Sequence, residues 1–392
     1  MTAVLKANWN YPTKVWHGPG RIAELADACA HAGISRPLLV TDAGLRDSAI
    51  VTGARELLRE AGLVTALFSD VKGNPTGGNV DAGLIAYRAG ECNGVIGMGG
   101  GSALDIGKCI AFMSGQARSL WDFEDIDDWW TRADPLGIAP IVAIPTTAGT
   151  GSEVGRAAVI TEEVSHEKKI IFHPLMLPAI VISDPELTVG LPPKLTAWTG
   201  MDALAHCMEA YCAPGFHPMA DGIAVEGMRL IQRYLPRAVA DGGDIEARSR
   251  MLAAASMGAA AFQKGLGAVH SISHPVGAIY DTHHGLTNGV VMPYVLSYNR
   301  AAIEGRMDEL ANALRLPGKG LDAVLAWLID LRVQLFVPNT LADLGVEAAR
   351  IDELAEKAQR DPSTGGNPVP MTVDGFKLLI RAAIGGNLTV SA

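Results

Sequence analysis

The chain has 392 residues, of which 48% are apolar and 19% charged, a composition that suits a packed globular enzyme and excludes a disordered or fibrous chain. The net charge of −10 and the absence of a basic run argue against nucleic acid or an anionic membrane as a partner. No apolar run is long enough to span a membrane, and the first residues lack the apolar segment of a secretory signal. Five cysteines without a C-x-x-C pair predict reduced thiols and a cytoplasmic protein.

The first half of the chain alternates short apolar runs with helical patterns. Strands are expected at 37–44, 64–71, 94–101 and at the start of 137–153, and helices at 48–63, 78–92 and 102–115. This β-α-β order predicts a parallel sheet with helices on both faces. Such sheets bind ligands at the carboxyl ends of their strands.

From about Pro192 the pattern changes to long helical segments at 195–211, 219–235 and 245–263. The last segment is rich in Ala, Gly and Met, which predicts a buried core helix. We therefore expect two domains: residues 1–190 form an α/β nucleotide-binding domain, and residues 191–392 form an all-helical domain that carries the candidate metal- and substrate-binding residues.

The helical half contains a candidate metal site. Asp202 and His206 are four residues apart, so on a helix both side chains can face one point. A second helix can place His270 at the same point, and we expect His284 to reach it from a loop beyond the C-terminal end of that helix. Three imidazoles and one carboxylate suit Fe(II), Zn(II) or a similar ion. A surface Asp–His pair is the alternative, although six of the 10 histidines lie between 206 and 284 among apolar or glycine-rich flanks.

Three pieces of the first half resemble a dinucleotide site. A glycine turn at 99–101 precedes a helix expected to begin at Ser102, and helix N-termini bind pyrophosphate. A capping pair of Ser102 and Asp105 is the alternative. The loop at 145–153 supplies hydroxyls directly after a strand. Asp42 ends the first strand, where a carboxylate can accept the ribose 2′-hydroxyl and repel the phosphate of NADP; a turn-forming Asp is the alternative.

Together, the motifs GGGSALDIGK, PTTAGTGSEV, DPELTVGLP, GMDALAHCMEAY and GAVHSISHPVGAIYDTHHG resemble the successive signatures of the iron-containing (group III) alcohol dehydrogenase family. The resemblance covers nearly the whole chain. It implies a Rossmann-like α/β N-terminal domain plus an all-α C-terminal domain, the fold shared with dehydroquinate synthase. It also implies hydride transfer between NAD(H) and an alcohol/aldehyde pair with Fe(II), Zn(II) or another divalent ion. We expect the chain to form a homo-oligomer, and specifically a dimer.

The resemblance also implies roles for individual residues. Asp202, His206, His270 and His284 match the family's metal ligands, and His274 matches a histidine near the nicotinamide that is often assigned to proton relay. The positions that match cofactor contacts are Asp42, Asn74, Gly100, Gly101, Ser102, Thr146, Thr147, Thr150, Lys168 and Leu187. Lys168 lies in an expected hairpin, and Lys169 is its alternative. Relatives usually carry Arg after Asn367-Pro368, where this chain has Val369.

The substrate is less constrained. Several segments look most like the 4-hydroxybutyrate dehydrogenase branch of the family. Arg156 and Lys264 flank these motifs and can pair with an anionic end group, while Phe262 can supply an apolar wall. Surface positions for Arg156 and Lys264 are the alternative. A short ω-hydroxy acid and its semialdehyde is the leading substrate class, followed by small neutral alcohols, diols or lactaldehyde.

The candidate metal ligands also bear on other functional classes. A lyase of the dehydroquinate synthase type, or a polyol dehydrogenase, uses differently spaced metal ligands, so the Asp202/His206 pair argues against both. A non-enzymatic nucleotide sensor would predict damaged ligand positions, and all four are intact here.

Overall fold

The computed structural model describes residues 13–165 and 167–391, so the N-terminal residues judged unlike a secretory signal lie mostly outside the described range. The described chain divides into two compact units. One comprises residues 13–147 and 151–191, and the other comprises residues 148–150 and 192–391. Each unit has its own core, and each is described by itself below.

The first unit is built on a six-stranded sheet whose strand order is β1-β8-β5-β4-β2-β3. Every neighbouring pair is parallel, as the alternating pattern predicts. The strands are β1 (Lys14–His17), β2 (Pro37–Val40), β3 (Ala66–Phe68), β4 (Gly94–Gly99), β5 (Ile141–Pro145) and β8 (Ile180–Ser183). Strands β1 and β8, each four residues long, were not expected.

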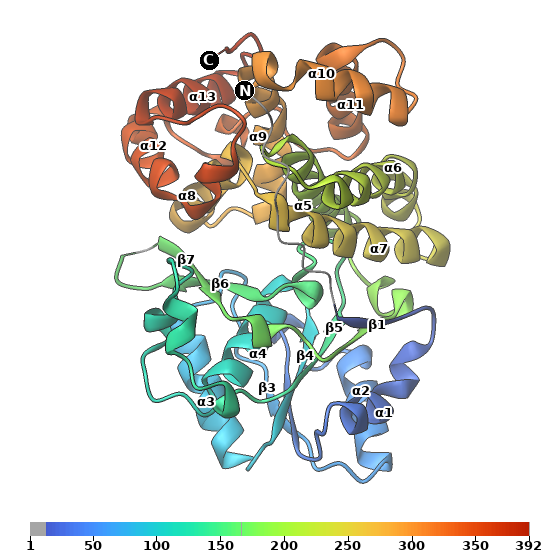
Figure 1. Ribbon diagram of the computed structural model, residues 1–392. Coiled ribbons are helices and arrows are strands. Elements are labelled where there is room, and N and C mark those ends of the chain that lie inside the picture. Colours follow the sequence, from blue (N-terminus) through green and yellow to red (C-terminus); the bar gives the residue numbers. More distant parts are fainter. Residues whose placement is uncertain (1–12, 166, 392) are drawn as a thin grey trace. The chain divides into compact units, whose positions relative to one another are not determined.

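Helices cover both faces of this sheet, which confirms the prediction. They are α1 (Leu25–His31), α2 (Ala49–Glu60), α3 (Gly77–Ala89) and α4 (Gly101–Met113). Figure 1 shows α1 and α2 on one side of the strands and α3 and α4 on the other. Successive strand residues point to opposite faces, so Leu38 joins the core under α3 and α4 while Leu39 joins the core under α1 and α2.

A small antiparallel sheet completes the first unit. Strands β6 (Ala157–Glu162) and β7 (Glu167–Phe172) form the expected hairpin, with Thr161 opposite Lys168. The hairpin also carries Lys169, whose amino group lies 3.3 Å from Glu162 and 3.4 Å from Glu124. Lys169 is therefore held in a local charge cluster.

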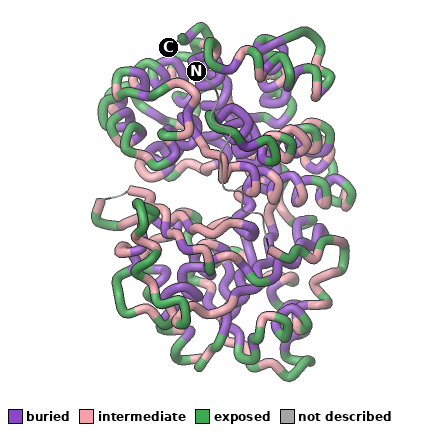
Figure 2. Tube along the Cα trace, in the orientation of Figure 1, coloured by how far each residue is buried: buried purple, intermediate pink, exposed green. Residues whose placement is uncertain are grey.

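The second unit is helical. Its helices are α5 (Pro193–Cys212), α6 (Pro218–Ala240), α7 (Ile245–Ala261), α8 (Ala268–Tyr280), α9 (His284–Tyr298), α10 (Arg300–Ala313), α11 (Gly320–Gln334), α12 (Ile351–Arg360) and α13 (Val373–Gly385). Helix α5 is central and packs against α6, α7 and α9. It is buried along nearly its whole length, which Figure 2 shows as a purple tube. Helix α7 lies in the same core, as its composition predicts.

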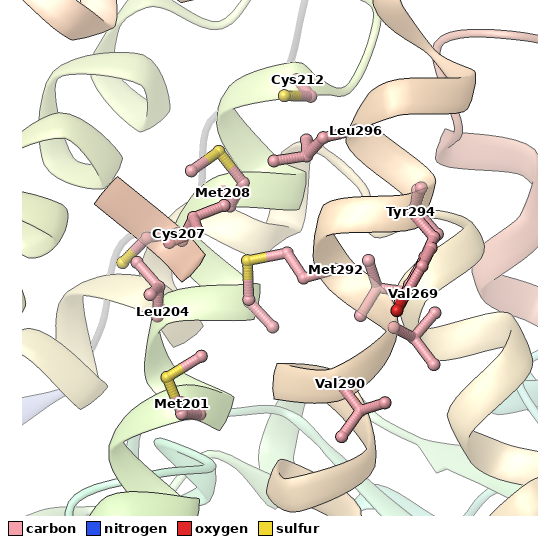
Figure 3. Packing of buried hydrophobic residues seen from close by; sticks show 14 of the residues in the cluster. Met201, Leu204, Cys207, Met208, Cys212, Val269, Val290, Met292, Tyr294 and Leu296 are labelled. Atoms are coloured by element: carbon pink, nitrogen blue, oxygen red, sulfur yellow. The ribbon is translucent and has the colours of Figure 1, made fainter. Parts of the chain in front are cut away.

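The contact between α5 and α9 is unusually close because α9 offers glycine where the two helices meet. A Cβ added at Gly285 would lie 2.1 Å from the carbonyl oxygen of Trp198 and 2.9 Å from the Cβ of Asp202. Figure 3 shows Met201 and Met208 of α5 beside Val290 and Met292 of α9. This packing brings the first turn of α9 against the turn of α5 that carries Asp202.

Two expectations about the chain as a whole can be compared with the structure. None of the helices within residues 13–165 and 167–391 is both long and apolar enough to cross a membrane. The five cysteines are free, and four of them are buried.

Candidate active site

Helix α5 supplies the first two candidate metal ligands. Asp202 and His206 lie one turn apart on its buried face, and both side chains are almost inaccessible to solvent. The Nε2 atom of His206 lies 3.9 Å from Oδ1 of Asp202. Burial lowers the pKa of His206 to about 4, although the neighbouring Asp202 carboxylate partly opposes this effect. His206 is therefore neutral near pH 7, the form in which imidazole binds a metal.

Helices α8 and α9 bring two more imidazoles to the same carboxylate oxygen. His270 lies in the first turn of α8, with Nε2 3.9 Å from Oδ1 of Asp202. The Nε2 atom of His284 lies 3.4 Å from that oxygen. His284 is the first residue of α9, so the expectation that it lies in a loop is wrong. Its position is fixed by the close contact of α9 with α5.

The geometry of these four side chains fits a divalent ion. Donor atoms about 2.1 Å from a tetrahedral ion lie about 3.4 Å from one another. The separations of 3.4 to 3.9 Å around Oδ1 of Asp202 are close to that value. The ligand atoms of Asp202, His206 and His270 all lie within 4.8 Å of one another, and His284 adjoins this group through its 3.4 Å separation from Asp202. Next to them, Oδ1 of Asn288 is buried without a hydrogen-bond partner, as expected of an acceptor that adjoins a site for a further group.

Sequence reasoning missed three residues that contact either a candidate metal ligand or His274. Glu209 accepts a hydrogen bond from Nδ1 of His270. Asn288 donates to Oδ1 of Asp202 at 2.8 Å, and the same nitrogen lies 3.2 Å from Nε2 of His284. Two of the three carried a signal in the sequence. Glu209 is three residues after His206 on one helix, and Asn288 is four residues after His284 on another.

The third missed residue, Asp361, pairs with His274. Nδ1 of His274 lies 2.7 Å from Oδ2 of Asp361, and both side chains are largely buried. The ring of His274 stacks on the ring of His284 with their centroids 5.3 Å apart. The structure therefore places His274 beside the candidate metal ligands, with Nε2 as the ring nitrogen that points away from Asp361.

The three candidate substrate residues have different surroundings. The ring of Phe262 lies 5.1 Å from the ring of His206, so an apolar surface adjoins the metal ligands. The amino group of Lys264 is buried and pairs with Asp221, which also pairs with Arg306 at 2.8 Å. Arg156 belongs to the sheet unit, where its guanidinium lies 5.5 Å from the ring centre of Phe172.

The glycine turn of the sheet unit is built around Asp42. Gly99 has a φ of +152°, and a Cβ there would lie 2.4 Å from Oδ2 of Asp42. The N–H of Gly100 donates to the same oxygen at 3.1 Å. Burial raises the pKa of Asp42 to about 6, against the opposing hydrogen bond from Gly100. Because Gly99 has no side chain, the carboxylate of Asp42 can approach the backbone at the end of β4.

Helix α4 begins at Gly101, one residue earlier than expected, and no side chain caps it. The capping pair of Ser102 and Asp105 is absent. The hydroxyl of Ser102 instead donates to the carbonyl of Gly73 at 2.7 Å, next to Asn74, and Asp105 accepts the N–H of Val159 at 2.9 Å. The uncapped N–H groups at the start of α4 remain suited to a pyrophosphate.

The remaining candidate cofactor residues are spread over the molecule. Thr146 donates its N–H to Gly99 at 2.9 Å, and Thr147 lies beside Gly100, so both adjoin the glycine turn. Lys168 lies on the β6–β7 hairpin, and Leu187 is buried after β8. Thr150 belongs to the segment 148–150 of the helical unit.

Comparison with known proteins identifies the family to which the chain is similar. Residues 12–185 match the family model for iron-containing alcohol dehydrogenases, and residues 196–384 match the model for the C-terminal part of the Fe-containing alcohol dehydrogenase family. The chain is 38% identical over 384 residues to 4-hydroxybutyrate dehydrogenase of Cupriavidus necator, a match that covers 95% of this chain and 99% of the relative.

Solved structures agree with this assignment. A 1,3-propanediol oxidoreductase superimposes with a TM-score of 0.91 and 35% identity, covering 96% of this chain and 100% of that one. A sulfoacetaldehyde reductase from Bifidobacterium kashiwanohense, solved in complex with NAD+, has a TM-score of 0.88 and 32% identity, covering 97% and 99% of the two chains.

The chain belongs to the iron-containing alcohol dehydrogenase family. It is an oxidoreductase that acts on alcohols, and the expected class, an NAD-dependent iron-containing alcohol dehydrogenase, is confirmed. The expected fold, with a parallel α/β N-terminal part and a helical C-terminal part, is confirmed as well.

Proposed function

We propose that this dehydrogenase interconverts a short ω-hydroxy acid and its semialdehyde, with 4-hydroxybutyrate and succinate semialdehyde as the leading pair. The observation that carries the proposal is the 38% identity to a 4-hydroxybutyrate dehydrogenase over nearly the full length of both chains. The similarity to a sulfoacetaldehyde reductase supports it, because sulfoacetaldehyde is also a short aldehyde with an anionic end group.

Asp202, His206, His270 and His284 would hold the divalent ion. In this family's chemistry such an ion supplies a Lewis acid to the oxygen of the alcohol or aldehyde. The separations around Asp202 and the neutral state of His206 support the assignment. The ring of Phe262 would exclude water on the side of His206.

His274 would move the proton that the alcohol loses. Asp361 accepts a hydrogen bond from Nδ1 of His274, and a carboxylate can only accept, so the proton of the neutral ring stays on Nδ1. Nε2 is then unprotonated and ready to take up a proton. Asp361 thus fixes the tautomer of the neutral ring of His274 and leaves Nε2 as the atom that would accept the proton.

NAD would lie at the carboxyl ends of β2, β4 and β5. Asp42, Gly100, Gly101, Ser102, Thr146 and Thr147 cluster there around the glycine turn. The other proposed cofactor contacts are Asn74, Thr150, Lys168 and Leu187. The uncapped N-terminus of α4 would receive the pyrophosphate, and Asp42 would accept the ribose hydroxyl.

The anionic end of the substrate would pair with Arg156 or Lys264. Arg156 has the stronger case, because the amino group of Lys264 already pairs with Asp221. The test compares kcat/KM for 4-hydroxybutyrate and 1-butanol in the wild type, in Arg156→Gln and in Lys264→Met, with the exposed Arg88→Gln as the control. The proposal predicts a wild-type preference for the hydroxy acid that Arg156→Gln removes. Equal use of both substrates by the wild type would contradict it.

A second candidate substrate is a small diol, because the 1,3-propanediol oxidoreductase superimposes on this chain over 96% of its length. Including 1,3-propanediol in the same comparison separates the two candidates. A diol preferred over 4-hydroxybutyrate would favour this alternative.

We also propose that the protein is a cytoplasmic homodimer. The five free cysteines support a reducing compartment. Light scattering of the purified protein tests the assembly, and a mass equal to a single 41.1 kDa chain would contradict a dimer.

A further inference from the structure

Glu209 is a buried carboxylate on the same face of α5 as two candidate metal ligands. It follows Asp202 by two turns and His206 by about one turn, and it is only 6% exposed. A buried carboxylate is costly unless hydrogen bonds and charges compensate for the lost water. The contacts of its two oxygens therefore indicate what this side chain does.

One oxygen of Glu209 holds the start of α8. Oε1 accepts the N–H of Val269 at 2.7 Å, in the first turn of that helix. Gly267, the N-cap of α8, has no side chain to perform this task. A Cβ at Gly267 would lie 3.1 Å from Oε1 of Glu209, so the glycine leaves room for the carboxylate to approach. An anion at this end of the helix is also favoured by the helix dipole.

The other oxygen of Glu209 contacts a candidate ligand directly. Oε2 accepts a hydrogen bond from Nδ1 of His270, the third residue of α8. Because a carboxylate accepts and does not donate, this contact places the ring proton on Nδ1 and the lone pair on Nε2. Nε2 is the atom that faces Oδ1 of Asp202 and lies 3.3 Å from the amide nitrogen of Asn288. The lone pair therefore points into the cluster of ligand atoms.

We propose that Glu209 is a positioning residue of the metal centre, which fixes both the tautomer and the direction of His270 by tying that ring to the N-terminus of α8. The inference rests on the proposed role of His270 as a ligand. Hydrogen-bond partners of metal-binding histidines raise the basicity of the ring and hold its orientation, and their loss typically weakens metal binding about 10- to 100-fold.

Glu209→Gln distinguishes this role from simple helix capping. The glutamine is almost isosteric, and its oxygen can still accept the N–H of Val269. Its NH2 group then faces Nδ1 of His270 and favours the tautomer with the proton on Nε2. A protonated Nε2 has no lone pair with which to bind a metal. If the amide instead turns its oxygen toward Nδ1, the bond to Val269 is lost and α8 loses its anchor.

Asn367 offers a matched control. Its Oδ1 accepts the N–H of Ala268 at 3.2 Å, so it also anchors the start of α8, yet it has no contact with His270 among the hydrogen bonds of the described residues. Asn367→Ala should lower thermal stability and leave the metal affinity close to that of the wild type. A role of Glu209 in capping alone would make the two variants alike.

The experiment titrates metal-free full-length protein with Co(II) in the presence of a competing chelator and follows the visible absorption of the bound ion. We expect Glu209→Gln to bind Co(II) about 10- to 100-fold more weakly than the wild type with an altered spectrum, and Asn367→Ala to bind normally. Wild-type affinity and spectrum in Glu209→Gln would overturn the inference. If Glu209→Gln does not fold, Glu209→Asp decides, because its shortened carboxylate should also weaken binding.

His270→Ala separates failure of this inference from failure of the proposed ligand set. If His270→Ala weakens Co(II) binding and Glu209→Gln does not, only the role of Glu209 is wrong. If His270→Ala also binds Co(II) as the wild type does, His270 is not a ligand and the proposed metal centre is itself incorrect.

Discussion

At the scale of single residues, the proposed role of Asp42 in cofactor choice would make that choice depend on pH. Its carboxylate accepts the N–H of Gly100 at the end of β4, and burial raises its pKa to about 6. A carboxyl with a raised pKa is charged only above that value. The negative charge that would repel the 2′-phosphate of NADP is therefore present at neutral pH and lost as the pH falls through 6.

We predict that wild-type discrimination against NADP weakens on acidification. Between about pH 7.5 and pH 5.5, the protonated fraction of a group with a pKa of about 6 rises from about a thirtieth to about three quarters. The ratio of kcat/KM for NADP to that for NAD should rise several-fold over this range. In Asp42→Asn the ratio should be higher throughout and nearly constant, whereas a constant ratio in the wild type would refute the role of Asp42.

A second prediction at this scale concerns His274. His274→Ala should lower kcat by about 100-fold or more, since general acid–base groups typically contribute that much, and should leave the metal content unchanged. The measurement is steady-state turnover across pH together with elemental analysis. Unchanged turnover with an unchanged pH profile would remove His274 from the proton pathway.

At the scale of elements, the position of His284 follows from where helix α9 begins and how closely it packs against α5. Helix α9 can approach α5 closely because Gly285 has no side chain, and a Cβ there would overlap the carbonyl of Trp198. The position of the candidate ligand His284 thus depends on the neighbouring Gly285, which has no side chain that could bind a metal. Packing of this kind cannot be predicted from local patterns, because it joins residues 198 and 285, far apart in the chain.

We predict that Gly285→Ala destabilises the protein and weakens metal binding. Inserting a methyl group into a packed contact typically costs about 1 to 3 kcal/mol, and here it would also push His284 away from Asp202. The matched control is Gly305→Ala in α10, where a Cβ would meet nothing within 4 Å. That exchange should leave the melting temperature unchanged or raise it. Equal melting temperatures for the two variants would contradict the account.

Features that depend on residues close together in the sequence could be predicted, and features that depend on contacts between distant residues could not. The spacing of Asp202 and His206 was sufficient to predict that both side chains lie close together on one helix. The start of α9 was missed because the Gly residues and Pro293 within it obscure the helical pattern. Asp361 was missed because its partner His274 is 87 residues away, and no local pattern connects them.

At the scale of the whole molecule, each unit carries one part of the proposed chemistry. The glycine turn and Asp42 lie in the sheet unit, and all four candidate metal ligands lie in the helical unit. The order of strands and helices was enough to predict both architectures, and the successive motifs were enough to predict the family. The substrate is proposed to depend on a few side chains such as Arg156 and Lys264, and neither fold nor family determines it.

The central claim is that Asp202, His206, His270 and His284 hold one divalent ion. The most direct measurement is the iron content per chain after anaerobic reconstitution with Fe(II) and removal of loosely bound metal, in the wild type and in His206→Ala. The account predicts about one ion per wild-type chain and a large loss in His206→Ala, which should still fold and bind NAD. A His206→Ala protein that retains the full ion, or a wild type that binds none, would contradict it.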